Sequence, residues 1–307
     1  MAKIMRELKI KDTTWISMKR PSKDDIDELQ ARFPQIHPLI MEELLTPTIR
    51  PRVENYDHHL YMVLHFPKFI PGVEKSVSYE IDFVLMQNVL ITVQYDDIEI
   101  IENFWHECEN GETIKERYGK TPVHLLYYLV RQFFSTAMRE LDQIQEVIDS
   151  IEEKVFTGYE KEILEDISYL KRDILDFRRS LKPQRLTLES LVSQSMNLYG
   201  EKVKPFLADL LGEYLKVWDL LETHKETLDA LYETNSSSLA SKTNEIMRVF
   251  TILAFISFIP TAIANIYGMN IENIPFASHD NSFFIILGAM IVITGAVYLV
   301  LKWRRLV

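Results

Sequence analysis

The stretch VFTILAFISFIPTAIANIYGMN, residues 249–270, sets the organisation of the chain. Its first 19 residues, 249–267, carry no charge. An α-helix needs about 20 apolar residues to cross roughly 30 Å of hydrocarbon. A second uncharged run of 19 residues, FFIILGAMIVITGAVYLVL, occupies 283–301. One such run could be a buried core helix, but two in succession at the end of an otherwise charged chain favour two transmembrane helices.

The basic residues around the two runs predict how the chain crosses the membrane. The connecting loop, 268–282, has no Lys or Arg. Basic residues flank the other ends of both runs: Lys242, Arg248, Lys302, Arg304 and Arg305. Because such residues stay on the cytoplasmic side, we expect a multi-pass protein of the cell (inner) membrane with its N- and C-termini in the cytoplasm.

Charge is distributed unevenly along the chain. The 307 residues include 34 basic and 45 acidic side chains, for a net charge of −11. Residues 243–307 hold four basic and three acidic residues, so the acidic excess lies in the first 242. An acidic surface argues against a nucleic-acid partner, because phosphate binding needs Lys and Arg. The single cysteine, Cys108, excludes an internal disulfide, and the N-terminus lacks the apolar run of a secretory signal peptide.

The first apolar run also carries polar residues on one face. At about 100° per residue, one stripe roughly 100° wide collects seven positions. These are Asn244, Met247, Thr251, Ala254, Phe258, Thr261 and Asn265. Such a stripe faces protein or a water-filled cavity, so these residues either join helices or line a pore. The alternation of polar and apolar positions favours a pore with an apolar constriction. Two helices cannot enclose a pore, which then requires a ring of identical subunits.

The first part of the chain is predicted to be an α/β domain. Runs rich in β-branched and aromatic residues predict strands at 15–18, 59–66, 77–86 and 89–94, the last two joined by a hairpin turn at Gln87-Asn88. Short helices are expected at residues 24–33 and 39–45. We therefore expect a sheet with helices packed against it.

Long helices are expected after residue 121. They cover 122–156, about 160–199, and a third segment that begins near Pro205. No helix breaker lies between Gly212 and Pro260, so the third helix should run into the first membrane span as a stalk. The fold class is α+β. The expected parts are an α/β domain (1–120), a helical hairpin (121–203), a stalk helix (204–248), two spans (249–267 and 283–301), an outer loop (268–282) and a basic cytosolic tail (302–307).

The sequence gives no support for an enzyme. Gly119-Lys120-Thr121 resembles the end of a phosphate-binding loop, but Ile114 stands where that loop needs its first glycine. We therefore expect no nucleotide and no organic cofactor, and the histidines show no zinc-ligand spacing. One helix carries an acidic series that is either a solvated face or a surface that attracts divalent cations. It consists of Glu140, Asp142, Glu146, Asp149, Glu152 and Glu153.

Tyr267-Gly268-Met269-Asn270 directly follows the first span, and Thr243-Asn244-Glu245-Ile246-Met247 precedes it. With two C-terminal spans and an acidic cytosolic part, this arrangement resembles the CorA family of magnesium transport proteins. The resemblance implies a homopentameric funnel in the lipid bilayer, with Gly268, Met269 and Asn270 at the outer mouth. It also implies polar rings at Asn244 and Thr261 and a narrow apolar stretch at Met247, Phe250, Ala254 and Phe258. Residues 50–54, RPRVE, resemble the family segment that leads into a central strand.

The resemblance also implies a regulatory metal site, which this sequence alters. Asp209 matches one of the acids, but the position of its usual acidic partner holds Ile70. Glu74 and Glu213 are the candidates to replace that partner. The outer loop departs as well, because Ile274-Pro275-Phe276 stands where relatives often have Met-Pro-Glu. The cation-attracting residues that remain there are Glu272, His279 and Asp280.

These features predict potential-driven uptake of hydrated Mg²⁺. Mg²⁺ gives up its water reluctantly, so a ring of Asn270 amides should hydrogen-bond its hydration shell, while Met247, Phe250 and Phe258 gate by dewetting. Intracellular Mg²⁺ bound between cytosolic domains should favour the closed state. Transport of Zn²⁺, Co²⁺ or Ni²⁺ by the same architecture is an alternative, and so is a membrane-anchored coiled-coil scaffold that conducts nothing.

Overall fold

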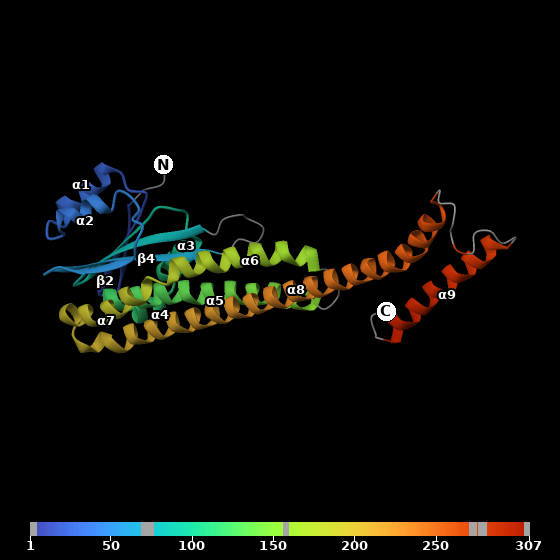
Figure 1. The fold of residues 1–307 in the computed structure, drawn as a ribbon. Helices are drawn as coiled ribbons and strands as arrows, with labels where there is room; N and C mark the ends of the chain where they lie inside the picture. Colours follow the sequence, from blue (N-terminus) through green and yellow to red (C-terminus); the bar gives the residue numbers. More distant parts are fainter. Residues whose placement is uncertain (1–4, 69–76, 156–159, 270–274, 276–280, 304–307) are drawn as a thin grey trace. The chain divides into compact units, whose positions relative to one another are not determined.

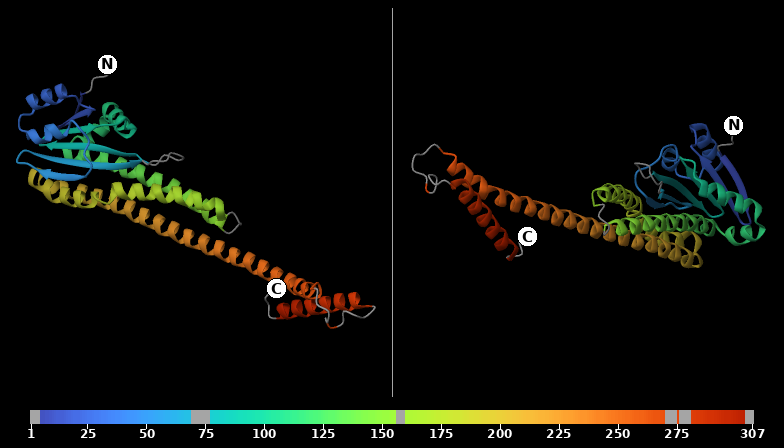
Figure 2. Two further views of the ribbon diagram at one scale, coloured as in Figure 1. Left: turned by 45° about the horizontal axis from the view of Figure 1, so that its top comes forward. Right: turned by 90° about the vertical axis from the view of Figure 1, so that its right-hand side faces the viewer.

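The computed structural model describes residues 5–68, 77–155, 160–269, 275 and 281–303. The chain forms two compact units, Met1–Tyr232 and Glu233–Val307. The first unit contains an α/β sandwich with long helices, and the second contains two apolar helical segments (Figures 1 and 2).

In the described part of the first unit, six strands form one mixed sheet in the order β1-β2-β6-β5-β4-β3. All neighbouring strands are antiparallel except β2 and β6, which are parallel. The strands are β1 (Met5–Ile10), β2 (Thr13–Lys19), β3 (Arg52–Asn55), β4 (His59–Lys68), β5 (Val77–Met86) and β6 (Val89–Gln94). The predicted hairpin is confirmed, since Leu85 on β5 pairs with Leu90 on β6 across the Gln87-Asn88 turn.

Both faces of the sheet are covered, so its side chains divide between two cores. On β4, Leu60, Met62 and Leu64 belong to the core under the long helices, whereas Tyr61 and Val63 belong to the core under α1 (Lys23–Arg32) and α2 (Pro38–Glu43). This follows from the alternation of side chains along a strand. Figure 1 shows α1 and α2 on one side of the sheet and α5 and α6 on the other.

Two strands and two helices of this unit were not predicted from the sequence. Strand β1, MRELKI, contains three charged residues and pairs along one edge with β2. Strand β3 forms from part of the 50–54 segment and lies at the opposite edge, beside β4. Helices α3 (Glu99–Asn110) and α4 (Glu112–Tyr118) follow the sheet. The predicted helices at 24–33 and 39–45 are confirmed as α1 and α2, with slightly different ends.

The long helices agree with the prediction except at one position. Helix α5 is Pro122–Val155, but the single helix expected over 160–199 is wrong. The chain instead forms α6 (Glu160–Leu181) and α7 (Gln184–Tyr199), separated at Lys182-Pro183. Pro183 has no N–H to donate to the carbonyl of Arg179, and its ring disfavours helical backbone at the preceding residue. The helix therefore stops at this proline and restarts after it.

The third long helix, α8, runs without interruption from Lys204 to Tyr267, as predicted, and follows the short 3₁₀ helix η1 (Glu201–Val203). Its 64 residues correspond to about 95 Å at 1.5 Å per residue. In the first unit α8 buries a stripe of residues three, four or seven positions apart: Leu207, Leu210, Tyr214, Val217, Leu221 and Leu228. Pro260 lies inside the helix and leaves the carbonyl of Ile256 without its usual donor.

The second unit contains the end of α8 and helix α9 (Ser282–Trp303). Among the described residues, α8 and α9 are the helices whose length and composition suit a membrane span. None of the residues in the apolar window of either helix is fully buried. Large apolar side chains such as Phe284 and Val292 on α9 are accordingly exposed. Exposure on this scale is typical of a surface that lipid or another subunit covers.

Candidate ion pathway

The membrane part of α8 has a covered face and an open face. Along the covered face, partly buried residues recur at spacings of three and four: Ile252, Ile256, Ile259, Ile263 and Tyr267. Ile256 and Pro260 share a cavity with Leu287 and Ile291, so this face lies toward α9. The open face therefore points away from α9, the neighbouring membrane helix.

The stripe predicted from the sequence lies on the open face. Its seven members are all exposed: Asn244, Met247, Thr251, Ala254, Phe258, Thr261 and Asn265. Phe250, which only the family resemblance added, is exposed as well. On a helical wheel the centre of this stripe is roughly 160° from the centre of the covered face. Thr251, at the edge of the stripe, lines a cavity with Leu301 of α9, whereas Thr261 and Asn265 line none of the cavities shared with α9.

The threonines of the stripe bond to their own helix. Thr251 Oγ1 donates to Met247 O at 2.7 Å, and Thr261 Oγ1 donates to Ser257 O at 2.8 Å. Each hydroxyl proton is engaged in this way, which leaves the oxygen lone pairs directed outward as acceptors. An array of acceptors suits the water shell of a cation.

Large apolar side chains lie between these polar positions. Met247, Phe250 and Phe258 are 60%, 64% and 67% exposed in the single chain. Along the helix, Thr251 and Ala254 lie between Phe250 and Phe258. Large apolar side chains of this kind can form a constriction that stops ions by excluding water.

The C-terminal end of α8 is closely packed. Gly268 N donates to Ala264 O at 2.8 Å, and Met269 N donates to Ile266 O at 3.3 Å. A Cβ atom on Gly268 would lie 3.2 Å from Ala264 O, so the missing side chain allows this approach. Tyr267 Oη donates to Pro275 O at 3.2 Å and ties the helix end to the loop. The other predicted loop residues, Asn270, Glu272, Phe276, His279 and Asp280, lie outside the described residues.

The acids predicted to hold a regulatory metal have partners inside the chain. Asp209 Oδ2 accepts a 2.6 Å hydrogen bond from Tyr127 Oη. Glu213 Oε1 lies 2.9 Å from Lys216 Nζ. Glu74 and Ile70 lie outside the described residues. Within the described ranges no group of three His, Cys, Asp or Glu side chains could hold a metal ion. The structure therefore gathers no metal-binding set around Asp209 from one chain's described residues.

Sequence reasoning missed the surroundings of Asp209. A cavity of about 310 Å³ is lined by Tyr127 and Arg131 from α5 and by Pro205, Phe206 and Asp209 from α8. Burial, followed by the bond to Asp209, raises the pKa of Tyr127 to about 12, so this hydroxyl keeps its proton. Tyr127 and Asp209 are 82 positions apart in the sequence, and no local pattern indicates that they meet.

The acidic series on α5 lies mainly at the surface. Glu140 is partly buried, and Asp142, Glu146, Asp149, Glu152 and Glu153 are exposed. The buried residues of this helix, such as Leu141, Ile144 and Ile148, lie on the opposite face. The series is thus the solvent side of an amphipathic helix.

An α/β unit, a long helix that continues into an apolar span with an exposed polar stripe, and a second apolar helix define a two-span membrane transport protein. The family model described as CorA-like Mg²⁺ transporter protein matches residues 11–304. The chain belongs to this family, which confirms the resemblance seen in the sequence.

Individual relatives agree over nearly the whole chain. It is 28% identical over 292 residues to the cobalt/magnesium transport protein CorA of Thermotoga maritima, covering 95% of this chain and 82% of the relative. The complete structure of the CorA magnesium transporter from Methanocaldococcus jannaschii has a TM-score of 0.81 at 23% identity and covers 95% and 90% of the two chains. The structure of the full-length CmaX protein has a TM-score of 0.74 at 20% identity and covers 96% of this chain and 88% of the CmaX chain. The two structures confirm the predicted fold class.

Proposed function

We propose that this chain forms a membrane channel through which Mg²⁺ enters the cell, driven by the membrane potential. The observation that carries the proposal is the exposed stripe on α8, which faces away from α9 and runs toward Gly268 and Met269. The family and the cobalt/magnesium transport name of the Thermotoga relative support a divalent cation as the transported ion.

The pathway needs several copies of the chain. One α8 helix presents a stripe but encloses no space, whereas a ring of copies with their stripes inward would enclose a pore. Five copies are proposed, as the sequence resemblance implies. In this arrangement α9 packs outside α8, toward the lipid, and Met247, Phe250 and Phe258 form the narrow apolar part.

The outer mouth is proposed to recognise the hydrated ion. Mg²⁺ binds six water molecules tightly and prefers octahedral geometry. Amide oxygens of Gly268–Asn270 from five subunits would accept hydrogen bonds from that shell without stripping it. Glu272 and Asp280 would raise the local cation concentration at the entrance. Thr261, Asn265 and Asn244 would supply further acceptors along the pore.

We further propose that internal Mg²⁺ closes the channel. A ligand shifts an equilibrium only toward the state it binds more tightly. Mg²⁺ at Asp209, assisted by Glu213 or Glu74 and by acids of a neighbouring subunit, would stabilise the closed state. The protein would lie in the inner membrane with both termini in the cytoplasm. The parts would divide as expected from the sequence, with 1–120, 121–203 and 204–248 cytosolic.

Magnesium flux into proteoliposomes tests this function. Purified protein is reconstituted with a magnesium-sensitive dye inside, and a negative internal potential is imposed. Wild-type protein should admit Mg²⁺, and Asn270→Ala should abolish entry while the oligomer stays intact. Asn273→Ala, three positions further along the same loop, is the matched control and should retain entry. Unaltered flux in Asn270→Ala would refute the assignment of the outer mouth.

Relatives named cobalt/magnesium transport proteins favour one alternative, in which the same architecture transports other divalent metal ions. Co²⁺, Ni²⁺ and Zn²⁺ added to the same liposomes will compete with Mg²⁺ if they share the pathway. Entry of Zn²⁺ without Mg²⁺ would assign the protein to that ion. If a verified oligomer conducted no ion, the scaffold hypothesis would replace the channel.

A further inference from the structure

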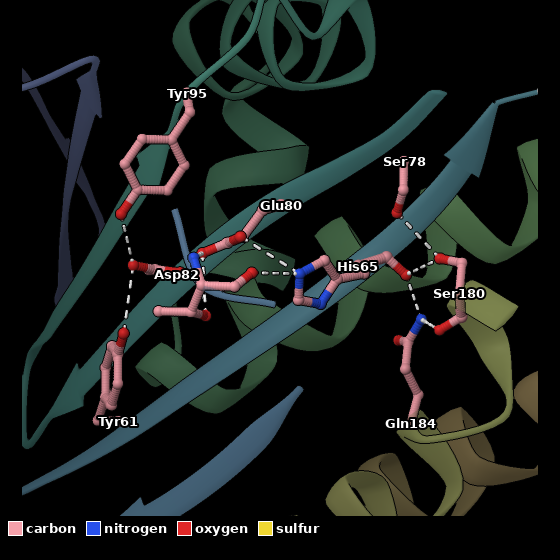
Figure 3. Close-up of polar contacts among 9 residues, drawn as sticks. Tyr61, His65, Ser78, Glu80, Asp82, Tyr95, Ser180 and Gln184 are labelled. Atoms are coloured by element: carbon pink, nitrogen blue, oxygen red, sulfur yellow. Dashed lines mark hydrogen bonds and ion pairs between the residues drawn. The ribbon is translucent and has the colours of Figure 1, made fainter. Parts of the chain in front are cut away.

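Two buried acids lie side by side in the sheet, far along the sequence from the ion pathway. Glu80 and Asp82 are two residues apart on β5, so both point to the face that α1 and α2 cover. Glu80 is 7% exposed and Asp82 is fully buried. Figure 3 shows them between Tyr61, Tyr95 and His65. Buried carboxyl groups are costly unless each charge is compensated.

Asp82 has hydrogen-bond donors on one oxygen. Tyr95 Oη donates to Oδ2 at 2.8 Å, and Tyr61 Oη donates to the same atom at 3.2 Å. Oδ1 is equally inaccessible and receives no donor from the described residues. An ionised carboxylate would leave this oxygen without a hydrogen bond, whereas a protonated one could use it as a donor.

Glu80 is held as an acceptor by the loop after α2. Thr48 N donates to Glu80 Oε1 at 2.6 Å, and Thr48 Oγ1 lies 3.2 Å from the same oxygen. His65 Nε2 lies 3.2 Å from Glu80 Oε2 and 2.9 Å from Thr48 O. The donors around Glu80 fit an ionised carboxylate.

His65 does not supply the missing positive charge. Its Nδ1 is buried and has no hydrogen-bond partner among the described residues. A proton on Nδ1 would be a buried, unsatisfied N–H, so the geometry favours donation through Nε2 alone. Nε2 can then donate to Thr48 O.

The arginines in this region have other partners. Arg179, which lines the same pocket as Glu80, pairs with Asp176 at 3.0 Å. Arg52 on β3 lies over the Tyr61 ring and pairs with Glu43 and Glu54. Arg20, after β2, donates through Nε to the carbonyl of Tyr95 and lies near Asp96. Two ionised carboxylates at Glu80 and Asp82 would therefore face each other without a cation in contact.

We propose that Glu80 and Asp82 form a buried proton-binding site, in which Asp82 carries the proton on Oδ1 and donates it to Glu80. The neutral acid accepts from the two tyrosines, and the ionised Glu80 holds Thr48. Burial and the neighbouring charge of Glu80 raise the pKa of Asp82 well above its ordinary value, in agreement with this arrangement.

The proton site controls a loop at the edge of a pocket. Thr48 and Ile49 line a pocket of about 760 Å³, together with His65, Glu80 and Ser180. On the far side of this pocket, Ser180 Oγ donates to the carbonyl of His65 at 3.2 Å. If Asp82 lost its proton, repulsion would push the Glu80 carboxylate away and weaken its bond to Thr48. The bond to Thr48 is thus strongest while Asp82 is protonated and Glu80 is ionised, and it weakens as the pH rises and Asp82 loses its proton.

Infrared spectroscopy of the full-length protein in detergent tests the protonated acid directly. At neutral pH the wild type should show the carbonyl band of a protonated carboxylic acid, and Asp82→Asn should remove it. Asparagine preserves the shape and can still donate to Glu80 and accept from the tyrosines. Asp96→Asn, at the exposed rim of the same pocket, is the matched control and should leave the band unchanged. An unchanged spectrum in Asp82→Asn would overturn the proposal.

Hydrogen exchange at Thr48 tests the link to the loop. Local opening that breaks the bond from Thr48 N to Glu80 should release the proton of Asp82. The equilibrium constant for this opening, obtained after correction for intrinsic exchange, should therefore rise about tenfold per pH unit. In Asp82→Asn this pH dependence should disappear. Equal pH slopes in the two proteins would show that the loop does not respond to the proton. Glu80→Gln should speed exchange at Thr48 at every pH, because the charged acceptor is lost.

Discussion

The hydroxyl of Tyr127 on α5 donates a 2.6 Å hydrogen bond to Oδ2 of Asp209 on α8. Arg131 lines the same cavity, and its guanidinium lies 5.9 Å from the centre of the Tyr127 ring. Asp209 therefore has a neutral hydrogen-bond donor within its own chain. A cation that binds to Oδ2 of Asp209 competes with the tyrosine hydroxyl, and this competition lowers the apparent affinity for the cation.

Tyr127→Phe should strengthen Mg²⁺ binding at Asp209. A hydrogen bond of this kind contributes about 1 kcal/mol, which corresponds to roughly a fivefold gain in apparent affinity when it no longer competes. Thermal stabilisation of the full-length protein by Mg²⁺ measures the change. Tyr128→Phe, whose hydroxyl instead accepts from Arg117 Nε at 2.8 Å, is the control. An unchanged Mg²⁺ midpoint in Tyr127→Phe, or a response that survives in Asp209→Asn, would place the sensing site elsewhere.

The open face of α8 should be accessible to water, and the covered face should not. Cys108 is the only cysteine in the sequence, so Cys108→Ser provides a background for single substitutions. In that background Thr261→Cys should react with a water-soluble thiol reagent and lose flux, because Thr261 lies on the exposed stripe. Ile263→Cys, which lies two residues on and is partly covered, should react more slowly. Equal reaction rates at the two positions would contradict a water-filled path along the stripe.

A buried hydrogen bond between β2 and β6 should contribute measurably to stability. Trp15 Nε1 donates to Thr92 Oγ1 at 3.0 Å, and both side chains are buried. Thr92→Val removes the acceptor and leaves the indole N–H unsatisfied, which should cost about 1–3 kcal/mol of unfolding free energy. In a Trp15→Phe background the same change should cost less, and a double-mutant cycle gives the difference. If the effects of the two substitutions on unfolding free energy were additive, the hydrogen bond would contribute nothing to stability.

Alkylation of Cys108 can follow the unfolding of the Thr92 and Trp15 variants. Burial, and then the charge of Glu107, raise the pKa of the Cys108 thiol to about 12. The thiolate is the reactive form, so a folded chain should resist alkylation at pH 8. Each destabilising substitution should increase the labelling rate in proportion to the unfolded population. Rapid labelling of the wild type would contradict the buried environment.

Acid should destabilise the sheet through His59. Burial, followed by the charges of His37 and His58, lowers the pKa of His59 to about 4. The unfolded chain has a pKa near 6.5 at this residue, so it binds the proton more readily between these values. Stability is therefore present above pH 6.5 and is lost as the pH falls toward 4. His59→Phe should flatten this dependence and retain the stacking on Tyr56, whose ring centre is 4.7 Å away. His106→Gln, at an exposed position, should leave the dependence unchanged.

Elements with a strong local pattern were predicted correctly from the sequence. The uncharged runs gave both apolar helices, and the absence of breakers after Gly212 gave the continuity of α8. Strands β4 to β6 contain many β-branched and aromatic residues and were found for that reason. The charged strand β1 was missed because its alternation is weak and its position depends on pairing with β2. The break at Pro183 was missed because the apolar period continues across it, although the missing N–H stops the helix.

The local order of residues was enough to determine the two membrane spans, the stalk that enters the first of them and the face of that helix on which polar residues gather. Periodicity along one helix fixes these features without reference to any other part of the chain. Contacts between distant segments required the folded structure. Tyr127 meets Asp209 because α5 and α8 pack in one unit, and Glu80 meets Thr48 because the loop after α2 returns to β5. Such pairs depend on how the elements pack in three dimensions, and the spacing of residues along the chain carries no record of that packing.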